Sequence, residues 1–311
     1  MYKKGWLVND CLTCIPDTKT IFNKLLDWIE NLDDKTNGYT DYSILPEVIE
    51  NRIRNTDKKP DYIIRNGTYF RKLNIDKNIK TIALIQDIHI ERPWYFVNQQ
   101  ETINAPNTMV VFCSNYVYNK YKPFMTHENY KIIPIGIDFN LFKPLQVNKH
   151  PEVLSNSILY IGSSLDHPKG FDRVLKIVND MPEQNFCFIM KDDFKIDHPR
   201  IKVFNKVDSN TVAFIINSCI CAICTSREET QHLAGLECGA CDVPIVATNV
   251  GMYNDIKDSQ EWGLIADDTN FVDKINYVIQ NRTQFKPRSF FEKRYTNEIS
   301  KNSWIELINS I

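Results

Sequence analysis

The 311-residue sequence contains no apolar run that approaches the roughly 18 residues a helix needs to cross a bilayer. Its first residues turn polar at Asn9-Asp10, too early for the apolar core of a signal peptide. We therefore expect a cytoplasmic protein without a transmembrane segment. The nine cysteines are then expected to be reduced thiols.

The chain also lacks a strong net charge. Its formal charge of −2 at pH 7 excludes a protein that is basic overall and disfavours tight binding to a nucleic-acid backbone. The charge is uneven, however, because residues 52–80 hold nine basic and three acidic side chains. This segment is either a solvated surface or a basic patch. The nine basic residues are Arg52, Arg54, Lys58, Lys59, Arg65, Arg71, Lys72, Lys77 and Lys80.

Three Cys-x-x-Cys pairs have the spacing of zinc ligands: Cys11/Cys14, Cys221/Cys224 and Cys238/Cys241. The sequence around Cys221 and Cys224 indicates a buried strand, and no glycine-containing turn follows Cys221. Side chains three apart on a strand point to opposite faces, so these two thiols could not hold one ion. We interpret the cysteines as small apolar core residues and predict no metal site.

Strand patterns alternate with helical patterns along the whole chain, which is typical of parallel α/β sheets. In the first half, strands are expected at 5–9, 61–65, 81–86, 109–113 and 131–136, and helices at 20–32 and 115–121. In the second half, strands are expected at 158–161, 186–190, 201–204, 220–224, 244–248 and 263–266. Helices are expected there at 171–181, 211–217, 233–240, 271–281 and 290–311.

This rhythm predicts an α/β protein with two Rossmann-like domains whose parallel sheets face a cleft between them. We expect an N-terminal domain over 1–145, a second domain over 146–288, and a terminal helix over 289–311 that packs back toward the first domain. Ligands of such sheets bind at the carboxyl ends of the strands.

The most informative stretch runs from Ser226 to Thr248, where a polar loop and a helix separate two buried strands. Glu229 lies in the loop and Glu237 lies on the helix, eight residues later. Ionised carboxylates only accept hydrogen bonds, so they suit the hydroxyls of a sugar or a ribose. The N-terminus of the helix favours anions. The alternative is that both glutamates are ordinary surface residues.

The pattern Ser-Arg-x-Glu-x7-Glu-x-Gly-Ala-Cys-x-x-Pro-x-Val in this stretch resembles the signature of retaining GT-B glycosyltransferases, family 4 and its relatives. Further segments fall in the order expected for that family. They are 133–138 with 142–144, Tyr160–Gly162 with Lys169-Gly170, and Asn249–Gly251. The resemblance covers about residues 130–282 well, and residues 1–130 only by architecture.

The resemblance implies that a hexose or pentose is moved from a nucleotide-diphosphate donor to a hydroxyl acceptor, with retention and without a metal. Glu229 would hold sugar hydroxyls, Glu237 the ribose, and Lys169 the diphosphate, where its charge would replace the metal of other glycosyltransferases. The donor is a substrate, so no cofactor is expected. The remaining residues implied in donor binding are Gly162, Ser163, His232, Leu233 and Gly251.

The sequence departs from the family pattern at three places. Ser163 stands where the family usually has arginine, so either another cation binds the diphosphate or turnover is slow. Thr230-Gln231-His232 replaces Gly-Phe-Gly, which suggests an unusual donor or a different acceptor fit. His232 either bonds the sugar or is a loop histidine without a role. Asn9-Asp10-Cys11 replaces a glycine pair after the first strand.

Asp87 and His89 follow the strand expected at 81–86, at the strand end where an acceptor would meet the donor. The family often places a His-Asp pair there, so either residue could position a sugar hydroxyl. The alternative is that neither has a role in the site.

Three interpretations of the acceptor and the activity remain open. The acceptor is a hydroxyl of a glycan, a lipid-linked sugar or a protein, or it is a hydroxymethylated base in DNA, as in some phage enzymes. The basic segment 52–80 favours DNA, and its aromatics Tyr62, Tyr69 and Phe70 could stack on an extruded base or belong to the core. The third interpretation is a sugar-nucleotide-binding module without turnover, to which Ser163 points.

Overall fold

The computed structural model describes residues 5–9, 50, 54–55, 61–66, 74, 76, 78–91, 93–146 and 149–311. The expected helix at 20–32, the Cys11/Cys14 pair and most of the basic segment 52–80 lie outside these residues. Within the described part of the chain, no helix has both the length and the apolar character that a membrane span requires.

The chain forms two compact units, one of residues 1–136 with 297–311 and one of residues 137–296. The boundaries expected from the sequence lie at residues 145 and 288. Arg288 shows why the segment after residue 136 groups with the second unit, since its guanidinium donates to the carbonyl oxygens of Phe139, Phe142 and Ala240.

The first unit contains a parallel sheet with the strand order β1-β2-β3-β4-β5. Its strands are β1 (Gly5–Asn9), β2 (Tyr62–Asn66), β3 (Lys80–Ile85), β4 (Thr108–Phe112) and β5 (Tyr130–Ile132). The described helices of this unit include α3 (Pro93–Ile103), α4 (Asn115–Tyr121) and α11 (Asn297–Ser310). The sequence did not indicate α3, which begins at Pro93, a residue suited to a first helical position.

The second unit contains a parallel sheet with the order β11-β10-β9-β6-β7-β8. Its strands are β6 (Ile158–Gly162), β7 (Phe186–Met190), β8 (Ile201–Asn205), β9 (Cys221–Cys224), β10 (Ile245–Ala247) and β11 (Gly263–Ile265). This is the doubly wound order, in which the chain starts in the middle, builds one half outward and then returns to build the other. The order reverses between β6 and β9.

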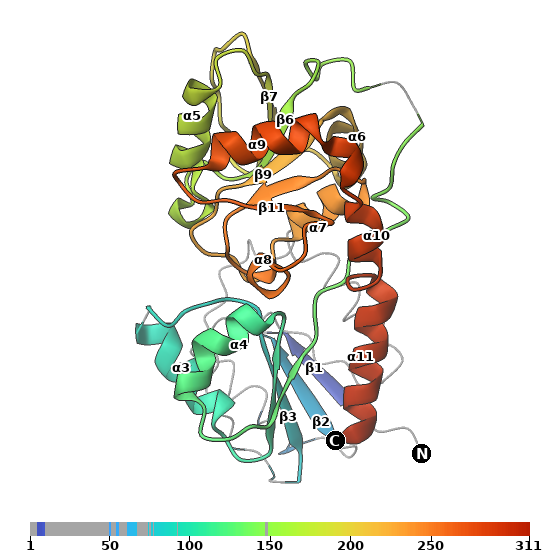
Figure 1. Ribbon diagram of the computed structural model, residues 1–311. Coiled ribbons are helices and arrows are strands. Elements are labelled where there is room, and N and C mark those ends of the chain that lie inside the picture. The colour runs from blue at the N-terminus through green and yellow to red at the C-terminus, as the bar shows by residue number, and fades with distance from the viewer. Residues whose placement is uncertain are drawn as a thin grey trace. The chain divides into compact units, whose positions relative to one another are not determined.

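Helices cover both faces of this second sheet (Figure 1). Side chains of α5 (Phe171–Asp180) and α9 (Phe271–Gln280) share one apolar cluster with alternate strand residues. Side chains of α6 (Ser209–Ser218) and α7 (Leu233–Ala240) share the cluster on the other face. The two buried faces explain why the strands read as continuous apolar runs in the sequence.

The cysteines of β9 follow this alternation. Cys221 packs on the face of α5 and α9, and Cys224 packs on the face of α6 and α7. The expectation that these two thiols point to opposite faces is therefore confirmed. Both are buried free thiols, as are Cys238 and Cys241.

The single helix expected over 290–311 is wrong, because two helices occupy this stretch. They are α10 (Pro287–Glu292) and α11. Between them, Thr296 forms an isolated parallel bridge with Ile137, and the backbone N–H of Ile137 donates to the carbonyl oxygen of Tyr295 at 2.9 Å. The backbone here bonds to a distant segment, which a helical pattern in the sequence does not reveal.

Close packing of α7 against α10 provides a test of this fold. A Cβ atom at Gly239 would lie 2.1 Å from a ring carbon of Phe291. Alanine has a higher helix propensity than glycine, which would stabilise α7 by up to about 1 kcal/mol. The steric overlap with Phe291 costs more than this gain, so we expect Gly239→Ala to lower the free energy of unfolding by about 1–3 kcal/mol. Urea unfolding followed by circular dichroism measures the change. In a Phe291→Leu background the cost should shrink. An equal cost in both backgrounds would contradict the packing.

Candidate functional site

The residues of the second unit that the sequence singled out gather around the point where its sheet reverses its strand order. β6 ends at Gly162, and the loop after it carries Ser163 and Lys169. The loop after β9 carries Glu229 and leads into α7. Both loops leave the carboxyl ends of neighbouring parallel strands. A doubly wound sheet binds its ligands at this position, because the chain diverges there and leaves a crevice.

These two loops are fastened to each other at Gly170. This residue has a left-handed backbone with φ 66°, and a Cβ atom on it would lie 2.1 Å from the carbonyl oxygen of Thr225. The hydroxyl of Thr225 donates to the carbonyl of Gly170 at 2.9 Å, and Arg173 donates to the carbonyl of Thr225 at 3.1 Å. Only glycine combines this conformation with so close an approach.

A charged cluster lies between the fastened loops. The ammonium of Lys169, on a 3₁₀ turn η2 (His167–Lys169), is 2.8 Å from Oε1 of Glu229. The hydroxyl of Ser226 donates to the same oxygen at 2.7 Å. The Glu229 side chain is only 7% exposed. Glu229 is therefore a buried carboxylate with a cation and a hydroxyl as its partners, which excludes the alternative of an ordinary surface glutamate.

Arg227 holds the turn that carries Lys169. Its backbone N–H donates to the carbonyl oxygen of Pro168 at 2.7 Å. Its guanidinium makes two bonds to the carboxylate of Asp172 on α5, at 2.8 and 2.6 Å. The hydrogen bonds from Arg227 lower the pKa of Asp172 to about 2, so this bidentate pair is ionised at neutral pH.

Lys169 and Glu229 each stabilise the charged form of the other. Burial opposes ionisation of Glu229, but His232, the ammonium of Lys169 and the hydroxyl of Ser226 together outweigh it, and the pKa of Glu229 is lowered. Burial likewise opposes the charge on Lys169, but the carboxylate of Glu229 raises the pKa of the lysine. Both groups are therefore ionised at neutral pH.

His232 adjoins this pair at the start of α7. It has a left-handed backbone with φ 69°, and its Nδ1 lies 2.7 Å from the hydroxyl oxygen of Tyr253. Burial lowers the pKa of His232 to about 4, although Glu229 acts in the opposite direction. The imidazole is therefore neutral at physiological pH.

One group of three described residues, Cys224, Glu229 and His232, places possible metal-ligand atoms within 4.8 Å of one another. Lys169 already neutralises Glu229 there. Burial raises the pKa of Cys224 to about 12, so its thiol is protonated at neutral pH. A metal ion would have to displace the proton of Cys224 and the ammonium of Lys169. These three residues are therefore better suited to the ion pair that the structure shows than to metal binding.

Gly251, from the sequence pattern, packs against Glu229. Gly251 has φ 55° and ψ −137°, and a Cβ atom on it would lie 3.0 Å from Cβ of Glu229. Its absent side chain thus lets the segment after β10 approach the glutamate. Glu237 lies half-buried on α7, and Leu233 is partly buried against the apolar cluster beneath that helix.

The loop after Gly162 carries serines and an acidic partner where the family pattern has arginine. The backbone N–H of Ser164 donates to Asp192 at 2.9 Å, and the two side chains are also hydrogen-bonded. The hydroxyl of Ser163 accepts from the backbone N–H of Leu165 at 3.2 Å. Asp192 follows β7, so the loop is stabilised by a carboxylate and gains no cation at Ser163.

Asp87 and His89 belong to the first unit, in the loop that follows β3. The hydroxyl of Tyr121 lies 3.0 Å from the carbonyl oxygen of Asp87. The same hydroxyl oxygen accepts a hydrogen bond from the backbone N–H of His89 at 3.1 Å. Asp87 is exposed and His89 is buried. Tyr121 therefore fixes the shape of this loop, and the role of the two side chains stays a prediction.

Sequence reasoning assigned no role to Ser226, Arg227 or Tyr253. Ser226 and Arg227 stand inside the motif, so the run Ser-Arg-x-Glu was the available signal for both. Tyr253 lies two residues after Gly251, and no local pattern connects it to His232.

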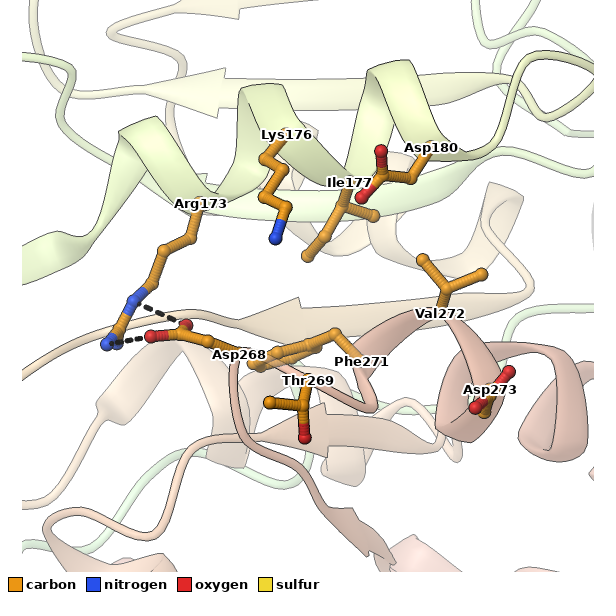
Figure 2. A pocket seen from close by; sticks show the side chains of 9 residues that line it. All are labelled: Arg173, Lys176, Ile177, Asp180, Asp268, Thr269, Phe271, Val272 and Asp273. Atoms are coloured by element: carbon orange, nitrogen blue, oxygen red, sulfur yellow. Dashed lines mark hydrogen bonds and ion pairs between the residues drawn. The ribbon is translucent and has the colours of Figure 1, made fainter.

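A second feature of this unit is a surface hollow of about 260 Å³ beside α5 and the start of α9 (Figure 2). Figure 2 shows the Arg173–Asp268 ion pair at one end, with an N–O distance of 2.8 Å. Lys176 and Asp180 line the side formed by α5. The hollow carries charges of both signs and holds none of the residues singled out by the sequence.

Comparison with known proteins agrees with this geometry. Residues 155–281 match the family model of the glycosyl transferases group 1. A comparison of the sequence with curated proteins gives no match. The matched segment contains the strands and loops that carry Lys169, Glu229 and Glu237.

Several solved structures have the same fold. Anabaena HepE in complex with UDP-glucose superposes with a TM-score of 0.72 at 14% identity, over 99% of this chain and 100% of HepE. A glycosyltransferase from Rickettsia africae gives a TM-score of 0.67 at 15% identity, over 99% and 98%. The sucrose-phosphate synthase of Thermosynechococcus elongatus gives 0.68 at 13% identity, over 94% and 79%. The chain thus has the GT-B fold, as the sequence predicted.

The depressed pKa of His232 provides a test of the site. The unfolded chain has an ordinary histidine pKa of about 6.5 and therefore binds a proton between pH 6.5 and 4 that the folded protein does not. The free energy of unfolding should rise with pH across this window and fall on acidification. His232→Asn should reduce that slope by up to about 1.4 kcal/mol per pH unit.

Urea unfolding at a series of pH values measures this slope. Asparagine tolerates the left-handed backbone, so the variant keeps the local conformation. His167→Asn, at an exposed position, is the matched control and should leave the slope unchanged. The same slope in His232→Asn and in the unsubstituted protein would contradict a neutral, partly buried imidazole.

Proposed function

We propose that this protein is a retaining, metal-independent glycosyltransferase that moves a hexose or pentose from a UDP-sugar to a hydroxyl acceptor. The observation that carries the proposal is the ion pair of Lys169 with the buried Glu229, at the point where the second sheet reverses its strand order. It combines a cation for a diphosphate with a hydrogen-bond acceptor for sugar hydroxyls, at the position where doubly wound sheets bind nucleotides.

The comparisons support a UDP-sugar as the donor. The family match covers most of the second unit, and HepE, the most completely covered of the structures above, was solved with UDP-glucose. The two chains superpose over nearly their whole lengths. These similarities concern the fold and the family and do not identify the transferred sugar. The choice of sugar depends on side chains particular to this chain.

Each residue has a role that its chemistry allows. Lys169 would neutralise the charge that develops on the leaving diphosphate, which is electrostatic stabilisation of the transition state. Glu229 would accept hydrogen bonds from hydroxyls of the transferred sugar, and Glu237 from the ribose. The leaving phosphate itself would act as the base, so no protein nucleophile is assigned.

The loop after Gly162 bears on the rate of this reaction. An arginine there would add a second cation to the diphosphate, whereas this chain has Ser163 and, bonded to the neighbouring serine, the carboxylate of Asp192. With less positive charge near the leaving group, turnover should be slower. A module that binds the donor without turning it over is the second candidate function, and this loop is the observation that favours it.

The described residues weaken the case for DNA as the acceptor. Two members of the 52–80 segment, Arg65 and Tyr62, are 2% and 1% exposed, so neither forms part of a surface patch. Tyr69 and Phe70 lie outside the described residues. We therefore propose a hydroxyl of a glycan, a lipid-linked sugar or a protein as the acceptor, with the modified base as the alternative.

Replacing Lys169 tests the proposed reaction. Lys169→Ala should lower kcat by about 10²–10³-fold, the usual effect of removing one group that stabilises the developing charge. Release of UDP from a panel of UDP-sugars, with and without acceptors, measures it. Lys176→Ala is the matched control, because this lysine lies on α5 beside the surface hollow.

Two results would overturn the assignment. Full activity in Lys169→Ala would remove the lysine from the mechanism. Strict dependence of turnover on Mg²⁺ or Mn²⁺, seen as complete loss in EDTA, would show that a metal, not the lysine, carries the charge. Tight UDP binding with no turnover of any UDP-sugar would favour the binding module instead.

Replacing the two glutamates separates their roles. Glu237→Gln should weaken binding of UDP itself, because the ribose belongs to the nucleotide, by about tenfold for a lost charged hydrogen bond. Glu229→Gln should leave UDP binding nearly intact and reduce sugar transfer. Calorimetry with UDP and steady-state kinetics measure the two effects. Equal losses of UDP affinity in both variants would contradict this division of roles.

A further inference from the structure

His232 lies directly before α7, Gly235 lies on α7, and Tyr253 lies on α8 (Met252–Asp255); the three residues are packed against one another. Nδ1 of His232 lies 2.7 Å from the hydroxyl oxygen of Tyr253. A Cβ atom at Gly235 would lie 1.9 Å from that oxygen and 2.6 Å from Nδ1. The glycine therefore provides the space in which the imidazole and the phenol meet.

This arrangement includes a backbone conformation that histidine rarely adopts. His232 has φ 69° and ψ 71°, in the left-handed region, at the residue that precedes the first turn of α7. Such a conformation persists only where the surroundings hold it. Here the hydrogen bond to Tyr253 holds the side chain, and Tyr253 in turn is fully buried with its ring 5.0 Å from that of Trp262.

The hydrogen bond also determines which ring nitrogen carries the proton. Burial raises the pKa of Tyr253 well above its usual value, so the phenol keeps its proton. Among the described residues, the only acceptor for that proton is Nδ1 of His232. Because the neutral imidazole accepts at Nδ1, its own proton lies on Nε2, and the ring has no other hydrogen bond within the described part of the chain.

The imidazole is next to the carboxylate proposed to bind the sugar. A ring nitrogen of His232 lies within 4.8 Å of a carboxylate oxygen of Glu229. Glu229 only accepts hydrogen bonds, and Nε2–H of His232 only donates them. Neighbouring sugar hydroxyls can donate to one group and accept from the other, so the two side chains complement each other.

We propose that His232 donates a hydrogen bond from Nε2 to a hydroxyl oxygen of the transferred sugar, and that Tyr253 is the positioning residue that fixes its tautomer. This inference rests on the proposed function. The His232–Tyr253 pair would then help to determine which sugar the protein accepts. The sugar must carry a hydroxyl oxygen at the ring position that faces Nε2 of His232. The glycine-containing sequence that the family usually has at 230–232 offers no such side chain.

Two variants test the pair. His232→Gly removes the imidazole and relieves the backbone, and Tyr253→Phe removes only the hydroxyl while keeping the buried ring. Both should raise KM for the UDP-sugar, about tenfold in His232→Gly for one lost hydrogen bond, and leave the Kd of UDP unchanged. Tyr277→Phe, at an exposed tyrosine on α9, is the matched control.

Deoxy analogues of the accepted UDP-sugar identify the hydroxyl concerned. In the unsubstituted protein, the analogue that lacks the hydroxyl bound by His232 should have a lower kcat/KM than the parent UDP-sugar. In His232→Gly this difference should largely disappear, because the partner of that hydroxyl is already gone. A merely structural role would give the same loss in both proteins for every analogue, and that result would overturn the proposal. So would an equal weakening of UDP binding.

Nitrogen NMR of ¹⁵N-histidine-labelled protein gives a readout that does not require activity. The proposal expects a neutral ring protonated at Nε2 in the unsubstituted protein and a mixture of tautomers in Tyr253→Phe. A proton on Nδ1, or an imidazolium at pH 7, overturns it. If the unsubstituted protein transfers no sugar but shows this tautomer, the proposed function fails while the positioning by Tyr253 stands.

Discussion

The site depends on one ion pair, that of Lys169 with Glu229. A buried carboxylate without a partner costs several kcal/mol, and a 2.8 Å contact with an ammonium and a second bond from Ser226 offset that cost. The pair also joins two loops that are 60 residues apart in the sequence. Neighbouring contacts keep these loops together. They include the close packing of Gly170 against Thr225 and the hydrogen bonds of Arg227 to Asp172.

Most of the second unit could be predicted from the sequence because its periodicity is unambiguous. Each strand buried on both faces reads as a short apolar run, and α5 and α7 were located to within one residue at either end. The strand order was not available from these patterns. The observed pairing of β6 with β7 and β9 shows that the loops carrying Lys169 and Glu229 leave neighbouring strands.

The errors and omissions have a common physical origin in long-range contacts. Residues 290–311 have helical composition throughout, yet Tyr295 and Thr296 bond to Ile137, and the helix divides there. Tyr253 could not be linked to His232 because the contact crosses 21 residues and needs the space left by Gly235. A motif identifies residues near each other in the chain, whereas a positioning residue can lie anywhere that the fold brings to the site.

The same ion pair indicates how the two parts of a donor would be recognised together. A neutral sugar hydroxyl cannot replace an ammonium as the partner of a buried carboxylate without leaving charge uncompensated. On the proposed function, a diphosphate would attract Lys169, and the sugar attached to it would supply hydroxyls to Glu229. Each exchange alone is less favourable than the two together, because it leaves one charge with a poorer partner. A free sugar would lack the charge to move Lys169, and a free nucleotide would leave Glu229 with the hydroxyl of Ser226 as its remaining described donor. On the proposed function, the buried pair therefore makes the intact nucleotide-sugar the preferred ligand, even though no single contact distinguishes it from its parts.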